Sequence, residues 1–295
     1  MANTRLIGPR VSALHPTGEA VEADATNDIC HGNTDGVEPH DKAIIAHVRV
    51  MVLCWGKFYE QHSDAVDNAY ALCRDLVTGS YFNGLAQYGV GRGSMAGTAN
   101  INFASPPATL SEDEARDNLF AWLGNGSLLA PAIDEPSLLY VLFLPPETKP
   151  TISTGKDDFC GYHHWAKLHP ESKDSDVFWA LIRTDSADQT SGSAFIKSLS
   201  YCVSHEIVEA VSSRDGRGYY KGTCEIGDLC EQTGTYNYRD WQVEQYWSQW
   251  DEKCINGENS VSLRRFLQIR GISGGSLTAL HTKIINVEYI ASQFR

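Results

Sequence analysis

Residues 193–213 read SAFIKSLSYCVSHEIVEAVSS, and this stretch decides the fold expected for the chain. Apolar side chains recur in it at intervals of three and four residues, which predicts an amphipathic helix about five turns long. His205 and Glu209 lie at the edge of the apolar stripe and are four residues apart, so they share one face of the helix. The helix therefore offers an imidazole and a carboxylate about one turn apart. The apolar positions are Phe195, Ile196, Leu199, Cys202, Val203 and Ile207.

This pair is suited to a metal ion, because neutral imidazole and carboxylate are both ligands of Zn²⁺. Glu206 is rotated by about 100° from His205, too far to be the second ligand but close enough to reach a metal-bound water. In H-E-x-x-H peptidases the corresponding glutamate takes a proton as water attacks a carbonyl. Here Glu209 replaces the second histidine. The alternative is an ordinary helix with two exposed glutamates and a partly buried histidine.

A downstream segment supplies candidates for a third ligand. CEIGDLC at 224–230 contains Glu225 and Asp228. We expect Glu225 to complete a three-ligand site with one open position, and Asp228 to accept from the other ring nitrogen of His205 or to serve as an alternative ligand. The glycine-containing connector SSRDGRGYYKGT at 212–223 suits a tight reversal of the chain. Tyr220, which follows this turn, is a candidate catalytic residue.

Two adjacent histidines precede the motif helix in CGYHHW at 160–165. One of them is a candidate for a further ligand or an oxyanion partner, and we take His163 for this catalytic role. The alternative is that both are surface or core histidines.

The organisation of the chain indicates one main globular unit. It has 295 residues, of which 42% are hydrophobic, enough for a full core. The polar composition of residues 1–42 predicts an extended or partly disordered arm. We expect residues 43–295 to form a single catalytic-type domain with the metal motif at 205–228. Strands and helices are expected to make an α/β (α+β) fold, a zincin-like domain with a mixed central sheet flanked by helices. Strands are expected at 44–55, 137–146, 176–184 and 277–290, and helices at 63–77 and 111–124.

Charge and hydropathy exclude some partners. The formal net charge is -13 and the pI about 5.2, which disfavours nucleic acid and anionic membrane surfaces. No run of ~18 to 20 apolar residues is present, so we expect a soluble protein without a membrane span. The first twenty residues lack the apolar region of a secretory signal. We expect a cytoplasmic protein as written, or a secreted one if a leader has been removed; the oligomeric state stays open.

None of the eight cysteines forms a C-x-x-C pair, which disfavours a thiolate zinc site. Cys54 and Cys73 lie in apolar patterns and are expected to be reduced core residues. Four others lie in loop-like segments, where disulfides would suit an oxidising compartment. These four are Cys160, Cys224, Cys230 and Cys254.

Several segments resemble one family. VMVLCWGKF at 50–58 resembles the W-Y-G-K-F signature of the phosphate-induced, or EXORDIUM-like, proteins. Four further segments are similar, in the same order, to blocks of the bacterial and fungal relatives of this family, and the resemblance covers about 45–255. These segments are CGYHHW, SHEIVEAVSSRDGRGYY, CEIGDLCEQ and VEQYWSQWDEKCI. The resemblance implies a mostly secreted, zincin-type metalloprotein. It also implies His205, Glu209 and either Glu225 or Asp228 as ligands, with Glu206 as base.

The leading hypothesis is a zinc-dependent hydrolase of zincin type that holds one divalent metal ion and acts on an amide or peptide bond. A first alternative is a lyase, isomerase or cyclase that uses the same site on a small metabolite. A second is a non-catalytic binding module in which the metal holds residues 205–230 together. In that module YNYRDWQVEQYWSQW at 236–250 would be a carbohydrate or partner platform, unless its aromatic side chains are buried.

Overall fold

The computed structural model describes residues 30, 36–41, 43–128, 137–152, 159–169, 175–185, 187, 191–220, 222 and 224–258. The strand expected at 277–290 lies outside these residues.

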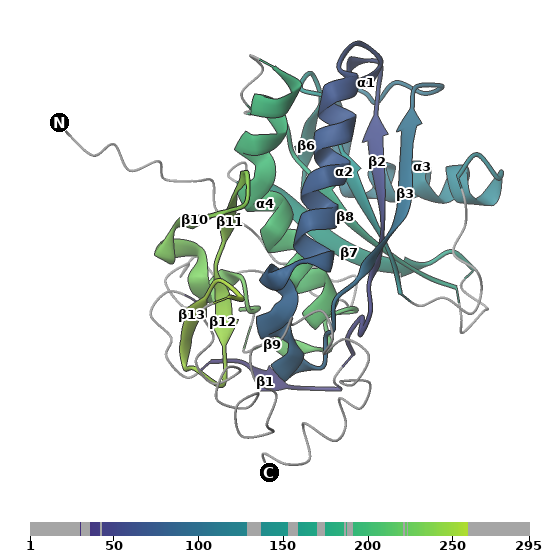
Figure 1. Cartoon of the computed structure of the whole chain (residues 1–295). Coiled ribbons are helices and arrows are strands. Elements are labelled where there is room, and N and C mark those ends of the chain that lie inside the picture. Colours follow the sequence, from purple (N-terminus) through teal and green to yellow (C-terminus); the bar gives the residue numbers. More distant parts are fainter. Residues whose placement is uncertain are drawn as a thin grey trace.

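A five-stranded mixed sheet forms the centre of the molecule (Figure 1). Its strands follow the order β3-β2-β5-β8-β7, in which β7 runs antiparallel to β8 and the other neighbours are parallel. The inner strands are buried along almost their whole length, which is typical of parallel strands covered on both faces. The bounds are β2 Arg49–Trp55, β3 Ser94–Ile101, β5 Leu138–Phe143, β7 Gly161–Lys167 and β8 Asp176–Ile182.

Two long helices, α2 (Ser63–Thr78) and α4 (Gly192–Ser212), lie side by side across one face of the sheet (Figure 1). The opposite face is covered by α3 (Glu112–Gly124), whose Leu119 and Trp122 belong to the same buried cluster as Trp55. Ser111 and Glu114 form the capping box that begins α3. The prediction of a mixed α/β fold, with helices flanking a mixed sheet, is confirmed.

The remaining helices and strands are short. They are α1 (Phe58–Gln61), η1 (Ser80–Tyr88), η2 (Asp228–Thr233) and the strand pairs β1–β9 (Glu38–Pro39, Tyr219–Tyr220), β4–β6 (Thr109–Ser111, Lys149–Thr151), β10–β11 (Thr235–Tyr238, Trp241–Glu244) and β12–β13 (Tyr246–Ser248, Lys253–Ile255). The β10–β11 pair packs along α4 (Figure 1), and its residues Tyr238 and Trp241 also reach Asp75 of α2 through hydrogen bonds. Within the described residues, no helix is both long and apolar enough to cross a bilayer.

The aromatic stretch at 236–250 contributes mainly to the core. Four of its aromatic side chains are each at most 5% exposed: Tyr238, Trp241, Tyr246 and Trp247. Their rings pack against α2, α4 and η1 side chains in the larger hydrophobic cluster. These four buried rings are not available to a carbohydrate or partner, whereas Tyr236 and Trp250 in the same stretch are partly exposed.

Disulfides fasten the periphery to this core. Cys30 is bonded to Cys224, so the described part of the N-terminal arm is attached to the domain. Val37 is buried and Glu38–Pro39 pair with Tyr219–Tyr220, which adds a second attachment. Cys54 and Cys73 are free and buried, as predicted.

Candidate metal centre

Helix α4 carries the centre of the candidate site. His205 is 1% exposed, and Glu206 and Glu209 are both 0% exposed. The exposed-glutamate alternative is therefore wrong, because the strands and loops packed on α4 cover both carboxylates. Burying a carboxylate is costly unless it is paired or binds a cation, so this concentration of acidic groups requires compensation.

Strand β7 brings His163 over α4. Successive side chains of a strand point to opposite faces, so His163 faces α4, while His164 packs near Trp179, a member of the cluster on the other face. The close approach depends on Gly161, where a Cβ atom would lie 2.8 Å from Cys202 Sγ and 3.0 Å from Glu206 Cγ.

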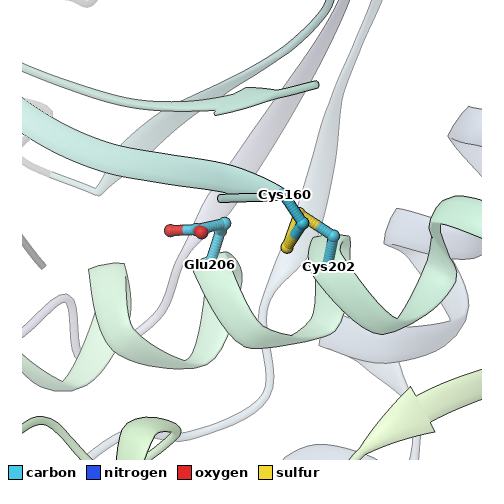
Figure 2. Close-up of side chains that lie close together, drawn as sticks. All are labelled: Cys160, Cys202 and Glu206. Carbon is cyan, nitrogen blue, oxygen red and sulfur yellow. A yellow bond between two sulfur atoms is a disulfide. The ribbon is translucent and has the colours of Figure 1, made fainter. Parts of the chain in front are cut away.

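A disulfide joins Cys160, next to the start of β7, to Cys202 on α4, one helical turn before Glu206 (Figure 2). The three side chains lie within reach of one common ion. The bond between the sulfurs removes both thiolates, so these cysteines link the start of β7 to α4 and do not bind a metal ion.

The loop at 224–230 folds back onto α4. The Asp228 N–H donates to Glu209 Oε1 at 3.0 Å, and the Glu225 N–H donates to Asp228 Oδ2 at 2.9 Å. Gly227 permits this approach, since a Cβ there would lie 2.8 Å from Glu209 Oε1 and 2.9 Å from His205 Nδ1. The expected return of this loop to the motif helix is therefore present.

Sequence reasoning missed Glu244, at the end of β11. Glu244 Oε2 lies 2.5 Å from His205 Nδ1, the nitrogen that we expected Asp228 to contact. Ser200 and Ser204 on α4 hold β11 in place through the backbone N–H groups of Gln242 and Glu244, at 3.0 and 2.9 Å. Ser200 and Ser204 are four helical residues apart, about 6 Å, and Gln242 and Glu244 are two strand residues apart, about 6.8 Å, so each serine lies opposite one backbone N–H. The matching spacing of these two pairs is the feature of the sequence that could have indicated the contact between β11 and α4.

Two groups of candidate ligands meet at Glu209. His205 Nε2 lies 3.0 Å from Glu209 Oε2 and 3.9 Å from Asp228 Oδ1. His163 Nδ1 lies 3.8 Å from the same Glu209 oxygen and 3.2 Å from Glu206 Oε2. Ligand atoms of one tetrahedral zinc ion lie roughly 3.3 Å apart, so both groups have spacings close to those of a coordination shell. Each also forms a potential metal-binding group in its own right.

Glu225 faces His163, with Oε2 at 3.3 Å from Nε2. Asp228 forms a potential metal-binding group with His205 and Glu209, and the role of Glu225 as third ligand stays a prediction.

The electrostatics of the cluster are dominated by burial and by opposite charges. Burial acts to lower the pKa of His205, but Glu209 and Glu244 outweigh it, so the pKa lies well above its usual value. Burial raises the pKa of Glu209, strongly raises that of Asp228 and brings that of Glu244 to about 7. In the absence of a cation, protons would supply the missing positive charge.

Several buried polar atoms of the cluster have no hydrogen-bond partner among the described residues. They are His205 Nε2, Glu206 Oε1, Glu209 Oε2 and Glu244 Oε1. An unsatisfied buried acceptor costs about 1–3 kcal/mol, and more when charged. The donor set of imidazole and carboxylate, together with these unpartnered atoms, fits a divalent cation such as Zn²⁺.

Tyr220 lies on β9, where its ring stacks on His40 with centroids 3.7 Å apart. This contact lies beside the β1–β9 pair, and a catalytic role for Tyr220 stays a prediction.

Comparison of the chain with models of known protein families and with curated proteins found no match.

Glu244 supplies a first prediction. Glu244→Ala is expected to lower the affinity for a divalent cation about 10- to 100-fold, because His205 loses the carboxylate that fixes its ring and tautomer. Titration calorimetry with Zn²⁺ measures the change. Glu147→Ala, at an exposed loop position, is the control. Equal affinity in the Glu244 variant and the wild type would contradict the assignment.

Proposed function

We propose that this protein is a metal-dependent hydrolase of zincin type that acts on an amide or peptide bond. The observation that carries the proposal is the buried pair His205 Nε2 and Glu209 Oε2, which lie 3.0 Å apart outside hydrogen-bond geometry, on the same helix as Glu206. Two buried groups that lie this close without a well-formed hydrogen bond between them support a cation bound between them.

His205, Glu209 and Asp228 would hold this cation, and Glu244 would orient the imidazole. A divalent cation there supplies a Lewis acid that polarises a carbonyl and lowers the pKa of water. Glu206 would accept the proton of the attacking water, for which its Oε1 is unpartnered. Removal of bulk water from these buried groups strengthens each electrostatic interaction.

The position of β7 favours an extended substrate. Among the described strands β7 is at the edge of the central sheet, and His163 lies in its first half. An extended peptide can add to such an edge through main-chain hydrogen bonds, which would bring its carbonyl groups past the site. This supports a peptide over a small metabolite.

The disulfides support action in an oxidising compartment. Three bonds, Cys30–Cys224, Cys160–Cys202 and Cys230–Cys254, surround the site. Two of them bracket the loop with Glu225 and Asp228. Such bonds persist in secreted and extracellular proteins and are rare in the cytosol. Of the two localisations expected, we therefore propose the secreted one.

Metal analysis tests the proposal. Purified wild-type protein is expected to retain at least one equivalent of a divalent cation, and His205→Ala to retain markedly less while staying folded. Asp228→Asn should lower affinity more than Glu225→Gln does, because Asp228 is nearer to His205 Nε2. Elemental mass spectrometry after dialysis gives the content, and circular dichroism checks the fold. Equal metal content in His205→Ala and wild type would overturn the assignment.

A further inference from the structure

The second imidazole of the cluster is arranged like the first. His205 has one ring nitrogen facing Glu244 and the other facing Glu209. His163 has Nε2 facing Glu225 at 3.3 Å, and Nδ1 facing Glu206 at 3.2 Å and Glu209 at 3.8 Å. Each histidine thus has one nitrogen oriented by a single carboxylate, as in carboxylate–histidine–metal arrangements.

The other nitrogen of each ring points to the same oxygen, Glu209 Oε2. If Glu225 accepts from Nε2–H of a neutral His163, the lone pair on Nδ1 faces two carboxylate oxygens. In that tautomer a buried acceptor faces only acceptors, which a metal cation between them would relieve; a protonated His163 would instead donate from Nδ1 to Glu206 Oε2 at 3.2 Å.

Two fully buried carboxylates belong to the same group, and Glu209 Oε2 is the oxygen that also faces His205. Glu206 and Glu209 are each 0% exposed, and each has one oxygen without a hydrogen-bond partner among the described residues, Glu206 Oε1 and Glu209 Oε2. Glu206, Glu209 and His163 lie close enough to ligate one ion, and this group shares only Glu209 with the group of His205 and Asp228.

Charge balance leads to the same conclusion. Five buried carboxyl groups belong to the cluster: Glu206, Glu209, Glu225, Asp228 and Glu244. With neutral imidazoles and all five carboxyl groups ionised, the state that bound cations favour, one divalent cation compensates two of these negative charges and leaves most of the charge buried, which is energetically costly. A second divalent cation compensates all but one.

We propose that the site is a two-metal centre, in which a second divalent transition-metal cation is held by His163 Nδ1, Glu206 Oε2 and Glu209, and Glu209 bridges it to the cation of His205. The proposal rests on the proposed function for the first cation and adds the second. Glu206 would bind through Oε2 and keep Oε1 as proton acceptor. Cations sharing one carboxylate oxygen would be separated by about 3.5–4 Å, the spacing of two-metal hydrolases.

Manganese provides the test. The full-length chain, freed of metal with a chelator, is titrated with Mn²⁺ and examined by electron paramagnetic resonance. We expect two equivalents to bind and to give the spectrum of two spin-coupled ions. His163→Ala, and the conservative His163→Gln, should each lose one equivalent and show the six-line signal of an isolated ion. His47→Ala, which removes a histidine outside the cluster, should keep both.

The outcomes separate the two proposals. Saturation of wild type at one equivalent, or an uncoupled signal from two distant ions, overturns the second site and leaves the hydrolase proposal standing. Unchanged coupling in both His163 variants overturns it as well. Absence of any bound cation, with Zn²⁺ also failing to bind, overturns the proposed function and the second site together.

Discussion

Replacement of Glu206 by glutamine is expected to lower turnover by a factor of ~10² or more, the usual contribution of a positioned general base. Glutamine has nearly the same shape as glutamate but does not accept the proton of the attacking water. The cation held by His205, Glu209 and Asp228 should remain bound, and metal content is measured together with turnover because Glu206 is also a proposed ligand of the second cation. Turnover is measured on a panel of peptides and, in parallel, small carbonyl metabolites, so that a lyase or cyclase reaction would also be detected.

Glu209→Gln, one turn further along α4, is the matched control. Because Glu209 lies 3.0 Å from His205 Nε2 and would be a ligand, its variant should lose the cation together with activity. If Glu206→Gln keeps full activity on a substrate that wild type turns over, Glu206 is not the base. If turnover is absent from wild type on both panels while the metal is bound, the centre is structural.

The second large effect is expected from Gly227→Ala. The backbone of Gly227 has φ -75° and ψ -49°, which alanine adopts without strain, so only contacts decide the outcome. A Cβ would lie 2.8 Å from Glu209 Oε1 and 2.9 Å from His205 Nδ1. Glu209 Oε1 accepts from Asp228 N–H and His205 Nδ1 faces Glu244, so neither side chain moves away freely.

We expect Gly227→Ala to destabilise the fold by about 1–3 kcal/mol, as overpacking of a buried site does. Because the loop with Asp228 must move outward, affinity for Zn²⁺ should fall at least ~10-fold, comparable with the loss of an orienting contact. Urea unfolding and Zn²⁺ titration measure the two effects. Gly124→Ala is the control, since a Cβ there meets nothing within 4 Å. Equal effects of the two substitutions would show that the contacts at Gly227 are not limiting.

Local patterns in the sequence predicted the elements of the fold well. The Ser111–Glu114 capping box, the apolar runs of β2, β5 and β8, and the periodicity of α4 all depend on residues close together in the chain. The return of the 224–230 loop was also predictable, because it follows α4 after a short connector. The i, i+4 relation of His205 and Glu209 follows from helix geometry alone.

The sequence by itself therefore determined which helix carries the metal motif, and that histidine and glutamate share one of its faces. Only the tertiary structure decided what surrounds them. Glu244 is 39 residues from His205 along the chain and contacts it because two serines of α4 hold β11 against the helix. His163 reaches Glu206 because Gly161 and a disulfide bring β7 close. Such contacts are fixed by packing between distant segments, which the periodicity of a single helix or strand does not predict. Packing also decided that Asp228 approaches His205 Nε2 while Glu225 faces His163.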